Sequence, residues 1–403
     1  MQNIVIVEPY RFVAPMATTV WTWPLRWWVA RRMRRTYGIE QIEFRGMEKI
    51  RDCLASRQSV LIAANHCRPC DPELVGLLCT RLGSPGFIMA SWHLFKQSRL
   101  QRILMRAAGV FSVHREGVDR EAIRTATALL AEGRRPLVIF PEGLVSRANG
   151  RLRNLMEGTA FIARAAAKVR AKESPVGKVV IIPVAVHYYF GGDLRKSLEP
   201  VLDEIERRLG GQPQADLPLR ERIIKLGEAL LNAKEVEYFG QAQPGPIGPR
   251  LPKLFERVVD PLERFHRIER PGVDPMERIK TIRTLIVDPW VKGELTREEK
   301  DRGRRQLADC YFAQQLACYP VDYLAADPTR ERLLETVERF EEDLTDVARI
   351  HRPLRAVGQV GDPIEVSAER RRGEEGDVVM NRLETSLRSM LADLESAGTP
   401  WSE

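Results

Sequence analysis

Short apolar runs alternate with amphipathic segments between residues 58 and 190. The run at 59–64 (SVLIAA) is typical of a buried strand, and a helix is predicted to follow at 72–82. Strands that alternate with helices predict an α/β fold, with a mixed, mostly parallel sheet and flanking helices. The remaining predicted elements are strands at 86–90, 110–114, 137–140 and 179–187, and helices at 118–131 and 155–168.

The pattern changes near residue 191, where strand signals disappear and charged helical segments take their place. Within this region the Pro/Gly-rich stretch 243–252 predicts a linker or a sharp turn. Strand-like sequence returns at 356–366, before a final amphipathic helix at 378–394. These shifts predict four parts: an N-terminal segment (1–40), an α/β core (41–190), a charged and largely helical insertion (191–350), and a return to the core with a C-terminal helix (351–403).

Composition narrows the class of protein. With 44% hydrophobic and 29% charged residues, the 403-residue chain is not a disordered one. The formal net charge of +8 favours anionic partners such as phosphates or an anionic membrane. Nucleic acid is not an expected partner, because the charge comes without a recognisable nucleic-acid-binding motif. Six cysteines are too sparse for a disulfide framework, so a reducing compartment is expected.

The segment 13–35 combines aromatic and basic residues. It holds five arginines together with Trp21, Trp23, Trp27 and Trp28. Trp favours the membrane interface, and Arg is drawn to anionic headgroups, so an interfacial segment is predicted. The alternative is a helix that packs on the protein, with its arginines solvated.

No membrane-spanning or secretory segment is predicted. The apolar run 12–25 is too short to cross a bilayer and is interrupted by Pro15 and Pro24. Residues 1–10 contain the acidic Glu8 and no basic region of the kind that begins a signal peptide. The expected location is therefore cytoplasmic, peripheral on the inner face of the membrane.

The stretch NHCRPCD at 65–71 follows the first predicted strand of the core and precedes a helix. Ligands bind at such junctions in open α/β sheets. A turn can bring the Asp71 carboxylate onto the His66 ring, where it would fix the tautomer and stabilise the imidazolium. His66 could then remove a proton from an acceptor hydroxyl. The alternative is that Asp71 is only the N-cap of the helix and His66 only a strand-end residue.

Cys67 and Cys70 in the same stretch offer a different chemistry. A CxxC pair at a strand-to-helix junction is typical of thioredoxin-like redox sites, and with His66 it could begin a metal site. A structural zinc site needs four ligands, and no second Cys/His pair is spaced to complete one.

Three further blocks lie at predicted strands. The strand 110–114 is followed by Arg115, which can hold a phosphate through two parallel hydrogen bonds. The stretch FPEG at 140–143 follows another strand, and its glycine permits close approach of the backbone to a ligand. In the apolar run 181–184, Pro183 predicts an edge strand or a bulge.

Together and in this order, the four blocks resemble those of the phospholipid and glycerol-phosphate acyltransferase family, which includes lysophosphatidic acid acyltransferases. That family carries an N-H-x4-D block, a G-x-x-F-I-x-R block, an F-P-E-G-T-R-S block and a short apolar block with a proline. The resemblance covers about residues 40–190. The predicted strand at 356–366 also resembles the last core strand of the family, which favours an insertion between the two.

The resemblance implies transfer of a fatty acyl group from acyl-CoA or acyl carrier protein to a hydroxyl of a phosphate-bearing acceptor, such as 1-acyl-glycerol-3-phosphate or another lysophospholipid. No metal or organic cofactor is implied. His66 would act as the base and Asp71 as its orienting partner. The residues implied to bind substrate are Asn65, Gly109, Arg115, Phe140, Pro141, Glu142 and Gly143.

The third block departs from the family pattern after Gly143. Leu144 and Val145 stand where the family has Thr-Arg, so the arginine of the block is missing. Arg147, Arg151 and Arg153 are candidates to replace it. His114 stands where the family often has a small or acidic residue. These departures bear on the identity of the acceptor, and two other classes stay open: a redox or metal-binding protein that uses Cys67 and Cys70, and a catalytically degenerate membrane scaffold.

Overall fold

The computed structural model describes residues 10–16, 18–20, 22–115, 117–172, 177–269, 274–320, 322–325, 327–369, 377–398 and 401. At its centre lies an eight-stranded sheet of order β1-β7-β6-β2-β5-β3-β4, with β8 paired to β6. Neighbouring strands run parallel, except that β7 and β8 are antiparallel to β6. The strands are β1 (Ile39–Arg45), β2 (Ser59–Ala64), β3 (Phe87–Ser91), β4 (Val110–Val113), β5 (Leu137–Ile139), β6 (Val179–Phe190), β7 (Leu354–Val360) and β8 (Ile364–Glu365).

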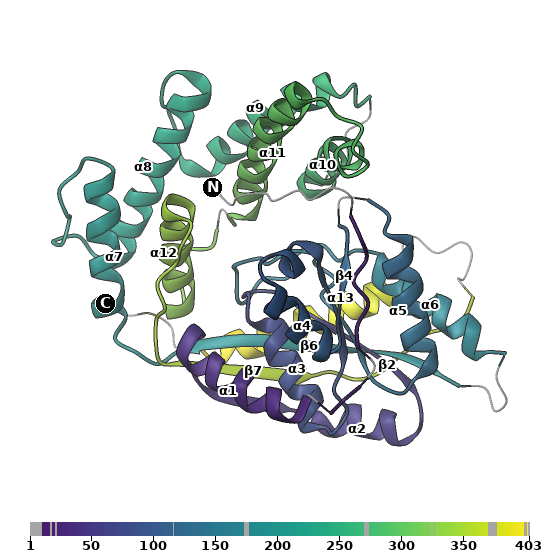
Figure 1. Cartoon of the computed structure of the whole chain (residues 1–403). Coiled ribbons are helices and arrows are strands. Elements are labelled where there is room, and N and C mark those ends of the chain that lie inside the picture. Colours follow the sequence, from purple (N-terminus) through teal and green to yellow (C-terminus); the bar gives the residue numbers. More distant parts are fainter. Residues whose placement is uncertain are drawn as a thin grey trace.

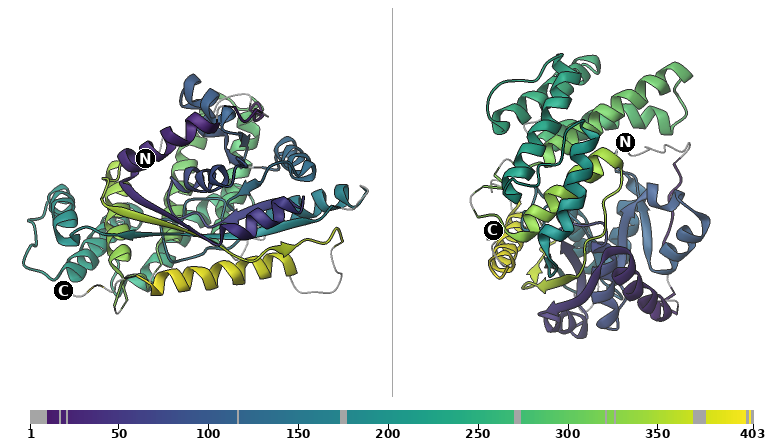
Figure 2. Two further views of the ribbon diagram at one scale, coloured as in Figure 1. Left: turned by 90° about the horizontal axis from the view of Figure 1, so that it is seen from below. Right: turned by 90° about the vertical axis from the view of Figure 1, so that its left-hand side faces the viewer.

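Helices cover both faces of the sheet (Figures 1 and 2), and a hydrophobic core lies on each face. Along β2, Val60 and Ile62 face one core while Leu61 and Ala63 face the other, as the two-residue repeat of a strand requires. The whole of β2 and β6 is therefore buried. The first core includes residues of α1 (Thr22–Tyr37), α2 (Met47–Ala55) and α3 (Asp71–Arg81). The second includes residues of α5 (Arg120–Glu132), α6 (Gly158–Arg170) and α13 (Val378–Ser396).

A helical segment connects β6 to β7 and gathers where β6 ends (Figure 1). Its members are α7 (Leu194–Arg208), α8 (Leu219–Phe239), α9 (Ile247–Phe265), α10 (Pro275–Val291), α11 (Arg297–Cys318) and α12 (Arg330–Thr345). Residues of α7, α8 and α12 extend the first core of the sheet, whereas α9, α10 and α11 form a third core of their own with the end of α8. The predicted fold class, a mixed and mostly parallel sheet with flanking helices and a largely helical insertion, is confirmed.

Two predictions based on proline are right only in part. The stretch 243–252 is not all linker, because α9 begins at Ile247; Pro249 falls in its first turn, where backbone N–H groups have no helical partner. Pro183 lies in a central strand rather than at an edge, but the alternative prediction of a bulge is confirmed, because the register along β6 shifts by one residue between its pairing with β7 and with β8. The carbonyl of Pro183 accepts the N–H of Gly361, which lies in the connection between β7 and β8. Pairing with β6 is interrupted in this connection, so no strand needs the N–H that Pro183 lacks.

The N-terminal part both packs on the core and exposes aromatic groups. In α1, Met33 is fully buried, while Trp27 and Trp28 are 68% and 49% exposed. Trp21 lies outside the described residues, as do Glu8 and the side chain of Trp23. The short helix η1 (Trp92–Lys96) and α4 (Arg99–Ala107) follow β3, and the N–H of Met16 donates to the carbonyl of Arg106 in α4. In the part of the chain that the structure describes, no helix combines the length and the apolar character needed to cross a membrane.

Candidate active site

Three of the predicted blocks lie at the end of the sheet where the parallel strands have their carboxyl termini. His66 follows β2, Phe140 follows β5, and Arg115 follows β4. These strands belong to the parallel part of the sheet, so their carboxyl ends point the same way. In α/β proteins, ligands bind at the carboxyl ends of the parallel strands.

The side chains of His66 and Asp71 form a hydrogen-bonded pair. Nδ1 of His66 lies 2.9 Å from Oδ2 of Asp71. A carboxylate only accepts hydrogen bonds, so Nδ1 carries the proton and Nε2 is left as a base. Asp71 is the first residue of α3 rather than its N-cap, which is Cys70. Its carboxylate also accepts the backbone N–H of Arg68 at 2.8 Å, an arrangement that closes the turn between the two catalytic candidates.

The imidazole is supported on several sides. The backbone N–H of His66 donates to Oε1 of Glu142 at 2.7 Å, and its carbonyl accepts the N–H of Ser146 at 2.7 Å. The ring of Phe140 lies 4.5 Å from the His66 ring, centre to centre. The side chain of His66 keeps 15% of its surface exposed, so the base is held in place and still reaches solvent.

Glu142 supports the turn with both of its carboxyl oxygens. Besides His66, it accepts the backbone N–H of Arg153 at 3.1 Å. Burial raises the pKa of Glu142 to about 7, against the opposing effect of these two N–H donors. The sequence suggested a contact between Glu142 and the acceptor; in the structure its oxygens face the backbone of the catalytic turn.

Arg115 and Gly143 join the ends of two strands. The guanidinium of the exposed Arg115 donates to the carbonyl of Gly143. Gly143 has a φ of +71°, and a Cβ there would lie 2.5 Å from the sulfur of Met156. The N–H of Met156 in turn donates to the carbonyl of Pro141 at 2.8 Å. The positive φ therefore favours glycine in this tight turn.

Two of the residues predicted to bind substrate, Asn65 and Gly109, do not face the open side of the site. Asn65 is fully buried, and its side chain exchanges two hydrogen bonds with the backbone of Val186, at 3.0 and 2.6 Å, which ties β2 to β6. Gly109 precedes β4, whereas Arg115 follows it, so the four-residue strand separates the two. At Gly109 the φ is +84°, and a Cβ would lie 2.9 Å from the carbonyl oxygen of Gly86.

The three arginines considered as replacements in the third block all contact the helical segment. Arg147 forms an ion pair with Glu342, and Arg151 forms one with Asp322 at 2.7 Å. Arg153 donates to the carbonyl of Ala317 at 3.1 Å and lies 3.0 Å from the sulfur of Cys318. The ring of His114 lies beside that of Tyr10, with 5.2 Å between ring centres and the two planes tilted by 33°.

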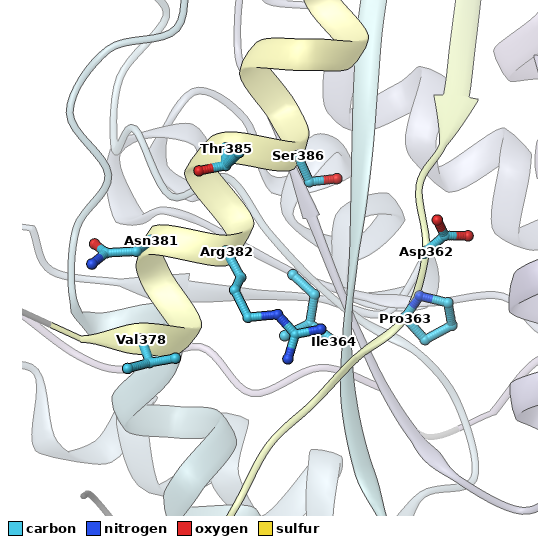
Figure 3. A pocket seen from close by; sticks show the side chains of 8 residues that line it. All are labelled: Asp362, Pro363, Ile364, Val378, Asn381, Arg382, Thr385 and Ser386. Carbon is cyan, nitrogen blue, oxygen red and sulfur yellow. The ribbon is translucent and has the colours of Figure 1, made fainter.

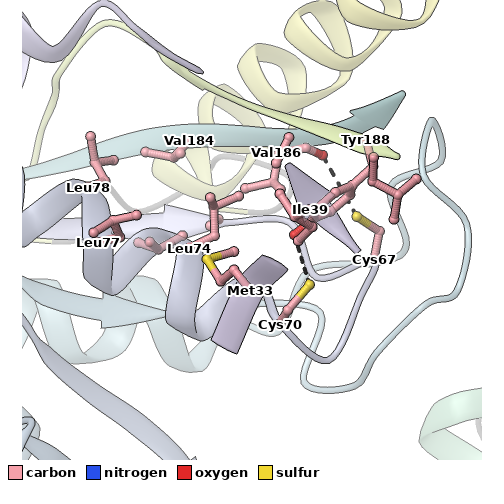
Figure 4. Close-up of a cluster of buried hydrophobic side chains, with 14 of the residues drawn as sticks. Met33, Ile39, Cys67, Cys70, Leu74, Leu77, Leu78, Val184, Val186 and Tyr188 are labelled. Atoms are coloured by element: carbon pink, nitrogen blue, oxygen red, sulfur yellow. Dashed lines mark hydrogen bonds between the residues drawn. The ribbon is translucent and has the colours of Figure 1, made fainter. Parts of the chain in front are cut away.

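Cys67 and Cys70 are both buried free thiols (Figure 4). Burial raises the pKa of Cys70 to about 12 and that of Cys67 well above its ordinary value. The sulfur of Cys70 lies 3.4 Å from Oη of Tyr188, and the sulfur of Cys67 lies 3.8 Å from the carbonyl oxygen of Val186. Thiol chemistry needs an accessible thiolate, so this environment does not favour a redox role. Within the described ranges, no group of three or more Cys, His or acidic side chains is placed to hold a metal ion.

Sequence reasoning missed Tyr188, which touches the pair, and Asn149, which holds Tyr188 in place. The hydroxyl of Tyr188 donates to Oδ1 of Asp71 at 2.6 Å. The side chain of Asn149 bonds to both the N–H and the carbonyl of Tyr188, at 2.9 and 2.6 Å. Tyr188 carried one usable signal, because it continues the buried face of Val184 and Val186 with a polar tip that needs a partner. Asn149 lies in an irregular loop without such a pattern.

An open groove lies between β8 and α13 (Figure 3). Its lining includes Asp362, Arg382 and Ser386. β8 pairs with Val180 and Ile181, which lie beside the start of β2, so the groove is at the opposite end of the sheet from His66. It contains none of the predicted site residues.

Comparison with known families agrees with the arrangement of the blocks. Residues 41–187 match the model of the family described as Acyltransferase, which confirms, for this part of the chain, the resemblance suggested by the motifs. A search of curated proteins found no match. The matched region contains β2 to β5 and most of β6, together with His66, Asp71, Arg115 and Glu142.

The environment of Glu142 predicts a pH-dependent stability. Its pKa in the folded state, about 7, lies above the ordinary value of 4.5, so the folded protein binds this proton more tightly than the unfolded chain. The contribution is present at low pH and is lost as the pH rises through 7. Between pH 5 and 8, the free energy of unfolding of the wild type should fall relative to that of Glu142→Gln, by on the order of 1–3 kcal/mol. Urea unfolding at a series of pH values measures this difference. The prediction is contradicted if the free energy of unfolding depends on pH in the same way in the two proteins. Glu121→Gln, at an exposed position, is the control.

The burial of the two thiols predicts that they are dispensable. We expect the double variant Cys67→Ser, Cys70→Ser to keep most of the acyl transfer measured for the wild type, since neither sulfur faces the open side of His66. Both thiols should also resist labelling in the folded protein. Complete loss of function in a folded double variant, or loss of a bound zinc ion, would favour the redox or metal interpretation instead.

Proposed function

We propose that the protein transfers a fatty acyl group from acyl-CoA or acyl carrier protein to a hydroxyl of a phosphate-bearing acceptor, because residues 41–187 match the Acyltransferase family model. The acceptor class that we favour is 1-acyl-glycerol-3-phosphate or another lysophospholipid. The observation that carries the proposal is the pair of His66 and Asp71, in which Nδ1 faces the carboxylate at 2.9 Å and Nε2 remains available as a base.

The reaction uses this pair for proton transfer. Nε2 of His66 takes the proton of the acceptor hydroxyl, and the oxygen attacks the carbonyl carbon of the thioester. The tetrahedral intermediate collapses with cleavage of the C–S bond, and His66 returns the proton to the leaving thiol. Asp71 stabilises the imidazolium between the two steps. The proton taken from the hydroxyl thus ends on the leaving thiol, and none of these steps uses a metal or an organic cofactor.

Arg115 is the residue we assign to the phosphate of the acceptor. Its guanidinium is exposed and contacts Gly143, the neighbour of Glu142, at the edge of the site. A guanidinium matches phosphate oxygens through two parallel hydrogen bonds. Arg147 and Arg151 each form an ion pair with a carboxylate of the helical segment.

A lipid acceptor fits a protein that attaches to the membrane surface. Trp27 and Trp28 are exposed on α1, and Leu100 and Ile103 are 67% and 54% exposed on α4. Figure 2 shows α1 and α4 on the same side of the sheet, opposite α13. Both helices carry arginines and neither has an acidic residue in its first turn. We therefore propose peripheral attachment to the anionic cytoplasmic face of a membrane through residues 13–35, with α4 beside them.

Loss of the base should abolish the reaction. We expect His66→Ala to lower acyl transfer by at least on the order of 100-fold, since general-base catalysis typically contributes that much. Mass spectrometry of acyl-CoA consumption against a panel of lysophospholipids measures it. His266→Ala is the matched control, because His266 lies in the helical segment, where it bonds to Gln306. Near-normal turnover by a folded His66→Ala protein would rule out this mechanism.

Membrane attachment makes a separate prediction. Co-sedimentation with vesicles should require anionic lipid and weaken as salt rises. Replacement of Trp27, Trp28 and Arg31 by alanine should release the protein, because Trp anchors at the headgroup level. The variant Phe265→Ala, which removes an exposed aromatic from the helical segment, should bind as the wild type does. If the wild type stays in the supernatant at low salt, the attachment proposal fails and a water-soluble acceptor becomes the better candidate.

A further inference from the structure

We propose that Tyr188 is a positioning residue for acyl transfer, which holds the Asp71 carboxylate in the plane that orients His66. This inference rests on the proposed function. The hydroxyl of Tyr188 donates to Oδ1 of Asp71 at 2.6 Å, while Oδ2 faces Nδ1 of His66 at 2.9 Å. Tyr188 therefore acts on the oxygen of the carboxylate that His66 does not use.

The two oxygens of Asp71 are bonded to different elements. Oδ2 accepts from the turn after β2, through His66 and the backbone N–H of Arg68. Oδ1 accepts its short hydrogen bond from β6, through Tyr188 at 2.6 Å, and has a longer contact with the Cys67 thiol at 4.0 Å. Rotation of the carboxyl group about its Cβ–Cγ bond would break both sets at once, and would leave buried oxygens without donors. The bond from Tyr188 thus fixes the orientation that His66 needs.

Tyr188 is itself held tightly. Its side chain is fully buried, and its hydroxyl also lies 3.4 Å from the sulfur of Cys70 (Figure 4). The amide side chain of Asn149 accepts the N–H of Tyr188 and donates to its carbonyl. A tyrosine with fixed backbone and buried ring has little freedom to move its hydroxyl, so the donor arrives at Asp71 from a constant direction.

The helical segment braces the same ring. The guanidinium of Arg68 lies 5.5 Å from the centre of the Tyr188 ring, a cation–π arrangement. Arg68 in turn contacts Glu338 of α12 through two nitrogen–oxygen pairs, at 3.0 and 3.4 Å. Glu335, one turn earlier in α12, accepts the N–H of Asn149 at 3.1 Å. α12 therefore secures both residues that confine Tyr188.

The variant Tyr188→Phe tests the proposal, because it keeps the ring and removes only the donor. We expect kcat to fall about tenfold with KM changed by less than about twofold, since Tyr188 acts through Asp71 and touches no substrate. In an Asp71→Asn background the same change should have no further effect on kcat. Tyr189→Phe is the matched control: it removes a buried hydroxyl that bonds to the Leu394 carbonyl on the opposite face of β6, and should leave kcat unchanged.

A second readout does not depend on turnover. The Nδ1–H proton of His66, observed by NMR, should broaden or shift in Tyr188→Phe and stay unchanged in Tyr189→Phe. The proposal is overturned if this resonance is unaffected by Tyr188→Phe, or if Tyr188→Phe costs the same factor in kcat with Asp71 and with Asn at that position. If the wild type transfers no acyl group, the proposed function fails, and the His66 resonance still decides whether Tyr188 positions the pair.

Discussion

The Asp71 carboxylate has no exposed surface, and a buried carboxylate is costly unless donors surround both of its oxygens. That requirement draws together parts of the chain that are distant in sequence. The turn after β2 supplies His66 and the N–H of Arg68, and β6 supplies the hydroxyl of Tyr188. The order of strands follows the same logic, because β6 pairs directly with β2 and so presents Tyr188 to the start of α3. Satisfying one anion thus fixes the geometry of the catalytic base.

The helical segment is attached to the core by apolar packing of α7, α8 and α12 and also by charged contacts. Arg147 and Arg151 of the loop after β5 meet acidic residues of the segment, and Arg68 meets Glu338. In one further contact the arginine belongs to the helical segment: Arg339 of α12 donates to the carbonyl of Ser146. The loop that carries Glu142 and Asn149 is therefore shaped by residues nearly two hundred positions later. This explains why the third block can lose its usual arginine position and still hold an ordered turn behind His66.

Features that depend on short stretches of chain could be predicted from the sequence. The apolar run of β2, the five-residue spacing of His66 and Asp71, and the helix that follows are local, and each appears close to its expected place. The failures are of a different kind. The place of Pro183 depends on β7 and β8, which enter the sheet from far along the chain. Likewise, no local pattern could pair Asn149 with Tyr188, or turn the Glu142 oxygens toward the backbone, because those contacts exist only once the loop has folded over β6.

The central position of β7 has a consequence for how the chain is made. β7 is inserted between β1 and β6, so Ile39 pairs with Leu354, a residue that a ribosome adds only after the entire helical segment. Until then β1 lacks this neighbour, and the long, apolar β6 presents an unpaired edge that other chains could join. The second half of the sheet is thus completed late, by contacts of very long sequence separation, which slow folding. In the meantime α9, α10 and α11 can bury their own core, so the nascent chain carries a compact body between two halves of a sheet that still have to meet.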